Sequence, residues 1–429
     1  MSTLRADGFP ETEIRLRARE GAAAAFPQGT DYGAALFGGG AAQRASADPL
    51  GLARLVPPVF MPQRLEKLVD LGREPLYSDV ELATDIGGLR SPLPVYLSAL
   101  GSTRAASAEV GEAASRQAGQ LGLPMVLGEN VVAHGGYGRT DGAPERSMLR
   151  RLRVYSEMLP EGLGGVAVQQ STEDADAEVW NLVYSDPSAL HLLESGRLAF
   201  ELKVGQGAKP GLGGMTLVDP STAARLHQHY PLEPVHGTGG FLRSSSPGTY
   251  TEEILRQQIR LMRNNFPRAQ VWVKLPPARD VAAAVALAWQ AGADAVTVDG
   301  AEGGTGWAPN AFLNHVGLPL GECLLRIGRG GGALLASGRM WEGARCVKAL
   351  ALGCRAVGLG RAALLAADED RADGLKRFVQ CLALEMRLLI SALGRYAPRD
   401  LKSEDVWLPH NLWSPAAPIG AAGEAERLP

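Results

Sequence analysis

Two short glycine–arginine loops late in the chain are the residues best suited to bind a ligand. Ser337–Arg339 and Gly358–Arg361 each follow an apolar run, each open a helical pattern, and lie about twenty residues apart. Glycine lets backbone N–H groups approach a phosphate closely, the following helix offers its positive end, and arginine adds charge. One such loop alone is equally typical of a simple turn. Together they predict a phosphate site made by Ser337, Gly338, Arg339, Gly358, Gly360 and Arg361.

Three other segments place polar or flexible residues where apolar runs end. Lys274 lies near the end of the run 271–275, and a lysine in such a run needs a partner unless it reaches the surface. The segment Asp299–Gly306 contains four glycines and a threonine, which suits close approach of a flat ring system better than a solvent turn. The segment Lys203–Gly214 combines two lysines, a glutamine and five glycines. These segments are expected to surround the reacting part of a ligand.

The elements that position these residues are short apolar runs alternating with helical patterns. Such alternation is typical of parallel strands covered on both faces. The expected strands are 94–100, 124–128, 165–170, 199–204, 271–275, 295–299, 333–337 and 356–360. Eight of them favour an α/β fold of the (β/α)8 TIM-barrel type, whose phosphate loops commonly follow the last two strands. A doubly wound sheet is the alternative, but it would normally place the glycine-rich turn after its first strand.

The ends of the chain lack this alternation. Residues 1–90 are rich in Gly, Ala and Pro and are expected to form an N-terminal arm packed on the barrel. The barrel is expected over 91–405. A C-terminal tail rich in Ala, Pro and Gly is expected over 406–429.

Composition excludes several classes of function. Hydrophobic residues make up 45% of the chain, and the formal net charge of −3 with no long basic run argues against a nucleic-acid partner. No run approaches the ~20 apolar residues of a membrane span, and no signal-peptide pattern begins the chain, so a cytoplasmic location is expected. The four cysteines form no CxxC pair and are expected to be free thiols, with no metal site.

The run Gln206–Gly214, Gln-Gly-Ala-Lys-Pro-Gly-Leu-Gly-Gly, resembles a highly characteristic motif of the FMN-binding domain of glutamate synthases. The resemblance continues at Lys274, at the Gly-Gly-Thr-Gly loop 303–306 and through 337–360, and covers roughly 90–405. In that family the region is a (β/α)8 barrel that binds FMN, where 2-iminoglutarate is reduced to glutamate. The resemblance therefore implies FMN as the cofactor.

The resemblance also implies roles for individual residues. Lys274 and Gln206 would contact the flavin ring, Lys209 would face the substrate, and Gln170 would lie near the ring. Besides the six residues of the two phosphate loops, the expected cofactor-binding residues are Ser98, Gln170, Gln206, Lys274, Gly303, Gly304 and Thr305. The expected catalytic residues are Lys274, Gln206, Lys209, Glu129 and Glu302.

Departures from the family pattern bear on the reaction. The stretch Arg361–Asp368 contains no cysteine, where glutamate synthases carry iron–sulfur ligands, and no glutaminase domain is expected before the barrel. The family's Gly-Glu-Gly-Gly becomes Gly128–Val131, its His-Asp becomes Ala301-Glu302, and a His-His pair is replaced at 246–248. The residues expected to face the cofactor match the family pattern. Those that would ligate the iron–sulfur centre or face the substrate differ from it. This pattern indicates the same cofactor with different chemistry.

The sequence therefore predicts an FMN-dependent oxidoreductase acting on a C–N bond of an amino acid or related small amine or imine. Glu129, Glu302, His134 and His236 are candidates for acid–base work, whereas the spacing of the histidines at 227, 229 and 236 argues against a metal site. The alternatives are a redox-neutral FMN enzyme of the isomerase type and a flavoprotein subunit that needs a partner. A small-molecule substrate is expected, while an electron-transfer partner and self-association are left open.

Overall fold

The computed structural model describes residues 4–6, 8–25, 48–99, 108–128, 148–172, 179–207, 215–227, 230–244, 250–303 and 310–409. Within these ranges, eight parallel strands close into a barrel in the order β11-β12-β13-β14-β4-β5-β6-β7. The strands are β4 (Val95–Leu97), β5 (Met125–Leu127), β6 (Val166–Ser171), β7 (Leu198–Lys203), β11 (Gln270–Leu275), β12 (Ala295–Asp299), β13 (Ala333–Ser337) and β14 (Ala356–Leu359). The predicted (β/α)8 barrel is therefore confirmed, with every predicted strand present.

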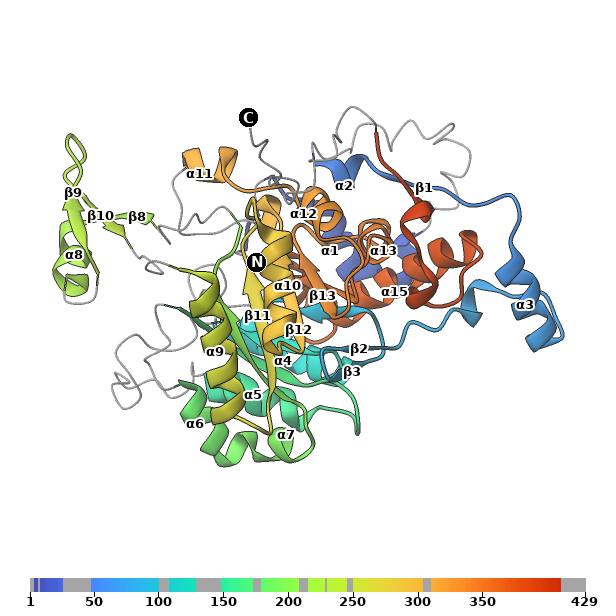
Figure 1. Cartoon of the computed structure of the whole chain (residues 1–429), viewed down its shortest axis with the longest axis horizontal. Helices are drawn as coiled ribbons and strands as arrows, with labels where there is room; N and C mark the ends of the chain where they lie inside the picture. Colours follow the sequence, from blue (N-terminus) through green and yellow to red (C-terminus); the bar gives the residue numbers. More distant parts are fainter. Residues whose placement is uncertain are drawn as a thin grey trace, which may run out of the picture.

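Helices surround the barrel, as Figure 1 shows for α4, α9, α10, α12, α13 and α15. Their bounds are α4 (Ala108–Leu121), α5 (Met148–Glu157), α6 (Val179–Ser185), α7 (Leu190–Glu194), α9 (Glu252–Asn265), α10 (Val281–Ala291), α11 (Asn310–His315), α12 (Leu320–Ile327), α13 (Gly343–Ala351), α14 (Arg361–Glu369) and α15 (Gly374–Ala392). Helix α9 shows why the pattern works: the Thr251 hydroxyl caps its start, and Leu255, Ile259 and Met262 recur on one buried face.

The amino-terminal end of the barrel is filled and closed. One inward-facing side chain from each strand builds a separate inner core: Tyr96, Val126, Ala167, Ala199, Trp272, Ala295, Leu335 and Ala356. The hairpin of β2 (Thr84–Ile86) and β3 (Leu89–Ser91) adds Ile86 and Leu89 to this core, and Trp272 donates a hydrogen bond to the Gly87 carbonyl at 2.9 Å. Since this end is packed, a ligand must enter from the carboxyl ends of the strands.

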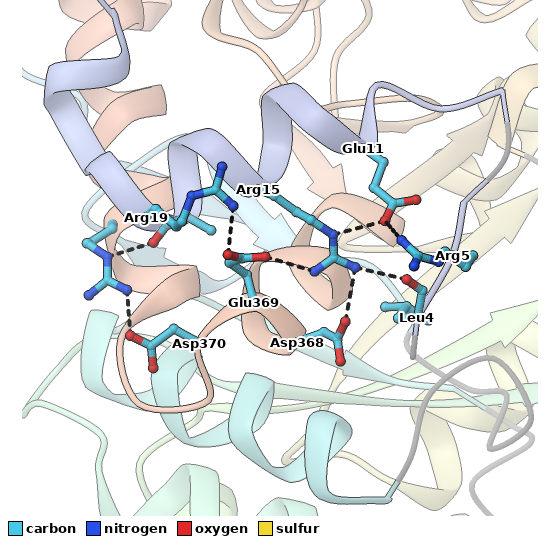
Figure 2. Close-up of polar contacts among 10 residues, drawn as sticks. Leu4, Arg5, Glu11, Arg15, Arg19, Asp368, Glu369 and Asp370 are labelled. Atoms are coloured by element: carbon cyan, nitrogen blue, oxygen red, sulfur yellow. Dashed lines mark hydrogen bonds and ion pairs between the residues drawn. The ribbon is translucent and has the colours of Figure 1, made fainter. Parts of the chain in front are cut away.

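The described part of the N-terminal arm packs on the outside of the barrel. Helix α1 (Glu11–Glu20) lies against α14 and α15, where Arg15 forms ion pairs with Asp368 and Glu369 at 3.1 Å each (Figure 2). Helix α2 (Pro49–Leu52) contacts α12 and α13. Strand β1 (Arg54–Leu55) pairs with β15 (Val406–Trp407), so two residues of the predicted tail join the arm in a small sheet. The predicted domain boundaries themselves stay a prediction.

Two features of the chain stand apart from the barrel in Figure 1. One is helix α3 (Pro62–Leu71), which buries none of its residues. The other is an antiparallel sheet of β8 (Met215–Val218), β10 (Phe241–Ser244) and β9 (Leu232–Pro234) with helix α8 (Pro220–Leu226), inserted after β7 and not predicted from the sequence. Among the described helices, none combines the length and apolar character that crossing a bilayer requires.

Candidate functional site

Above the inner core, the barrel interior contains polar side chains in hydrogen-bond contact. Because successive strand residues point to opposite faces, Gln169, Glu201 and Thr297 lie on the same inner face as the inner-core residues two positions before them. Glu201 accepts hydrogen bonds from Gln169 Nε2 at 2.5 Å and from Thr297 Oγ1 at 3.2 Å. The carboxyl group therefore lies in the centre of the barrel with partners on the strands to either side.

Lys274 lies in the same interior, one strand from Glu201. Its Nζ is 3.2 Å from Asp299 Oδ2, and each of the two side chains is only 7% exposed. Asp299 also accepts a hydrogen bond from the Ser337 hydroxyl at the end of β13. Lys203 of β7 is in register with Lys274 and is likewise buried. Two lysines and the Asp299 carboxylate therefore lie near the carboxyl ends of neighbouring strands, and Asp299 is an ion-pair partner of Lys274.

Burial changes the protonation of this cluster. It raises the pKa of Glu201, and the positive charge of Lys274 opposes that rise. Burial, followed by the nearby Glu201 charge, raises the pKa of the Tyr96 phenol far above its usual value. A carboxyl with a raised pKa can hold a proton at pH values where an ordinary glutamate cannot. Burial therefore favours the protonated form of Glu201 more than it would be favoured in an exposed glutamate.

The two predicted phosphate loops lie side by side, since Ser337 and Gly358 are in register on β13 and β14. A Cβ added at Gly358 would lie 2.2 Å from Ser98 Oγ, so this glycine is required for contact between the strands. A Cβ added at Gly360 would meet no atom of the described residues within 4 Å. Among the described residues, the space in front of Gly360 is therefore open, and a phosphate is expected there.

Arg339 and Arg361 add positive charge beside that space. Arg339 has a φ of 56°, in the left-handed region that non-glycine residues rarely adopt. Arg339 donates to the Gly8 carbonyl at 2.8 Å and Arg361 to the Glu302 carbonyl at 3.1 Å. Within the described parts of the chain, neither guanidinium forms an ion pair with a carboxylate. Two cations that lack carboxylate partners beside an open glycine loop fit an anionic ligand.

Two effects lower the pKa of Arg361. The larger is desolvation by neighbouring groups, although the residue as a whole is exposed, and the second is the like charge of Arg339. An arginine nevertheless stays protonated in a protein. The two arginines therefore repel each other, and a bound dianion would relieve that repulsion.

Glu302, a predicted acid–base residue, has structural partners. Its carboxylate lies 2.7 Å from Arg345 Nη2 and accepts from the Leu320 amide at 3.1 Å, at the start of α12. Arg345 is also 3.0 Å from Asp48, so this ion pair links the arm to the barrel. Burial raises the pKa of Glu302, and Arg345 opposes the rise. Its predicted acid–base role stays a prediction, which this geometry does not favour.

The other predicted residues divide by location. Ser98 Oγ is buried without a hydrogen-bond partner of good geometry in the described ranges, and Gln206 is half-buried just after β7. Gly303 packs near Asp299, because a Cβ added at this glycine would lie 3.6 Å from Asp299 Cγ. His236 is exposed in the turn between β9 and β10. Glu129, His134, Lys209, His229, Gly304 and Thr305 lie outside the described residues.

The glutamine of β6 that faces the interior is Gln169. Gln170 has the opposite parity and is in register with Leu202 of the outer core. Sequence reasoning missed both Gln169 and Glu201. Counting alternate positions back from Lys203 along the run Ala199–Lys203 would have found Glu201, because inward side chains repeat every second residue.

All four cysteines are free and buried. Burial raises the pKa of Cys323 to about 12 and that of Cys381 to about 11, so these thiols are poor nucleophiles and poor metal ligands. Within the described residues, no group of three or more His, Cys, Asp or Glu side chains is placed to hold a metal ion.

Comparisons with known sequences agree with the predicted family. Residues 191–372 match the family model described as the conserved region in glutamate synthase. The archaeal-type glutamate synthase [NADPH] of Dehalococcoides mccartyi is 34% identical over 184 residues, which cover 41% of this chain and 36% of that protein. The archaeal glutamate synthase [NADPH] of Methanocaldococcus jannaschii is 33% identical over 177 residues, covering 39% and 34%. The chain thus spans about a third of the length of these relatives.

Solved structures agree with the barrel fold. A soluble mutant of (S)-mandelate dehydrogenase from Pseudomonas putida matches with a TM-score of 0.55 at 18% identity, covering 94% of this chain and 99% of that one. A flavocytochrome b2 variant with sulfite bound matches at 0.56 and 15%, covering 97% and 89%. A mandelate oxidase variant with a monooxide FMN adduct matches at 0.51 and 18%, covering 84% and 89%. At these identities the likeness shows the fold alone. The sequence matches therefore show that residues 191–372 of this barrel are similar to the conserved region of glutamate synthases.

Proposed function

We propose that this chain is an FMN-dependent oxidoreductase that acts on a C–N bond of an amino acid or a related small amine or imine. The observation that carries the proposal is Lys274, whose buried ammonium lies at the mouth of a closed barrel beside Asp299. The glycine–arginine loops after β13 and β14 lie at the same end of the barrel. The glutamate synthase relatives support the reaction class, and the FMN adduct in a mandelate oxidase of the same fold supports the cofactor.

The residues at this end of the barrel fit FMN. Gly360 leaves open space for the phosphate, Arg339 and Arg361 supply its counter-charge, and the helix α14 that begins at Arg361 presents its positive end. The ring would then lie across the strand ends, within reach of Lys274. Only a backbone with little side-chain volume permits such an approach.

FMN, when bound, supplies the capacity to accept or donate a hydride. Lys274 would provide positive charge where negative charge develops on the ring, in a site with little water to screen it. Asp299, itself held by the Ser337 hydroxyl, fixes the position of the Lys274 ammonium. Glu201 can hold a proton below them, because its pKa is raised by burial.

Electron delivery from outside the chain is part of the proposal. The relatives are named as NADPH enzymes, and this chain spans about a third of their length. We therefore expect a nicotinamide-dependent partner domain or protein to exchange electrons with the bound flavin.

The proposal is tested by titrating the purified chain with FMN and then adding candidate substrates anaerobically. We expect stoichiometric FMN binding and bleaching of the flavin absorbance by an amino acid or amine. The matched panel contains the corresponding 2-hydroxy acids, which share the carboxylate and carbon skeleton but have a C–O bond in place of C–N. Failure to bind FMN, or bleaching by 2-hydroxy acids alone, would contradict the proposal.

A further inference from the structure

The N-terminal segment reaches the proposed phosphate site through Phe9. This residue lies just before helix α1, is 9% exposed and belongs to the main hydrophobic core. The carbonyl of the preceding residue, Gly8, accepts the hydrogen bond from Arg339 Nη1. A segment more than 300 residues away in sequence therefore contacts the loop after β13.

Both arginines of the proposed phosphate site lie against the Phe9 ring. The Cζ of Arg361 is 4.7 Å from the ring centroid, and the Cζ of Arg339 is 5.6 Å from it. A guanidinium at such a distance from an aromatic face is attracted by the ring quadrupole. The ring therefore holds two like charges near each other that would otherwise separate and sample many side-chain conformations.

The arm is anchored to the same helix that begins at the phosphate site. Helix α14 starts with Arg361, beside Phe9, and ends with Asp368 and Glu369, which form ion pairs with Arg15 of α1. Figure 2 shows Arg15 between Glu11 and these two acidic residues. The anchor at one end of α14 thus fixes the arm, and with it Phe9, relative to Arg361 at the other end.

We propose that Phe9 is a positioning residue for the cofactor phosphate: its ring preorganises Arg339 and Arg361 to receive a phosphate dianion. This inference rests on the proposed FMN function. Preorganisation strengthens binding because the cost of ordering the two long side chains is met in folding rather than in association. Phe9 acts only through the arginines, so its contribution must be confined to ligands that carry the phosphate.

The test compares FMN with riboflavin, which has the same ring system without the phosphate. Both dissociation constants are measured by quenching of flavin fluorescence for wild type, Phe9→Leu and Phe9→Tyr. We expect Phe9→Leu, which keeps apolar volume but removes the aromatic face, to raise the FMN dissociation constant about tenfold and leave that of riboflavin unchanged. Phe9→Tyr keeps the aromatic face and should retain FMN affinity.

Arg19→Gln is the matched control. It removes an exposed ion pair between the same arm and Glu369 and should change neither constant. Equal weakening of FMN and riboflavin in Phe9→Leu would mean a merely structural role and would overturn the inference, as would unchanged FMN affinity. Wild-type protein that binds neither ligand would refute the proposed function, and this inference with it. Wild-type binding with unaltered selectivity in Phe9→Leu would refute the inference alone.

Discussion

Replacement of Lys274 by methionine tests whether its ammonium compensates buried negative charge. Lys274 Nζ is 3.2 Å from Asp299 Oδ2, and both side chains are 7% exposed. At an effective dielectric constant of roughly 20, two unit charges at this separation attract by about 5 kcal/mol. Desolvation of the two charges offsets much of that attraction in the intact pair. Removing only the lysine leaves the carboxylate buried and uncompensated, which costs about 3–5 kcal/mol of the free energy of unfolding.

The loss is large enough to measure by thermal unfolding of the FMN-free protein. At roughly 2 cal/mol/K of unfolding entropy per residue, a chain of this length has an unfolding entropy of about 0.9 kcal/mol/K, so Tm should fall by about 3–6 °C. The matched control is the double variant Lys274→Met with Asp299→Asn, which removes both charges. We expect it to recover most of the lost stability, because burying a neutral pair costs less free energy than burying one unpaired charge.

Two results would refute this reasoning. One is a Lys274→Met protein that melts at the wild-type temperature. The other is a double variant that is less stable than the single variant by the full cost of a second, independent substitution. Either would mean that the two charges do not act as a coupled buried pair.

Three further outcomes are expected. Gly360→Ala should leave Tm unchanged, because the added Cβ meets no described atom within 4 Å, yet raise the FMN dissociation constant at least about tenfold. Gly358→Ala, whose Cβ would clash with Ser98, should lower Tm of the FMN-free protein. The reverse pattern would mean that the phosphate does not lie beside Gly360. Burial raises the pKa of Glu201, so its contribution to stability is present below the ordinary value of 4.5 and is lost as pH rises through the raised value. Glu201→Gln does not titrate at this position and should therefore gain stability relative to wild type as the pH rises above 4.5 in urea unfolding. A stability difference that stays constant with pH would count against this. Arg345→Met removes the guanidinium that forms ion pairs with Asp48 and Glu302, so it should cost about 3–5 kcal/mol of the free energy of unfolding and speed proteolysis near residue 48. A variant that resists protease as well as wild type does would contradict that role.

The barrel could be predicted from the sequence because its strands are specified locally. A parallel strand buried on both faces must be a short apolar run, and runs such as 295–299 and 333–337 satisfy that requirement without reference to the rest of the chain. The predicted phosphate loops were chosen in the same way, since glycine and arginine directly follow two such runs. The motif Gln206–Gly214 then indicated the family that the comparisons support.

The sequence alone did not reveal which side chains meet. Glu302 was predicted as an acid–base residue, and only the fold shows that Arg345 and the start of α12 lie against its carboxylate. Gln170 was expected to lie near the flavin ring, and only the register of β6 against β7 shows that Gln169 is the glutamine on the inner face. The inserted antiparallel sheet was also missed, because its short, half-exposed strands lack a strong apolar pattern.

The order of strands and helices, and the residues at the ends of the strands, could thus be inferred from local patterns in the chain. The contacts of Phe9 with Arg339 and Arg361, and the ion pair of Asp299 with Lys274, became visible only in the folded chain. The physical reason is that hydrophobic periodicity is a property of neighbouring residues, whereas charge pairs and ring contacts depend on segments that closure of the barrel brings together.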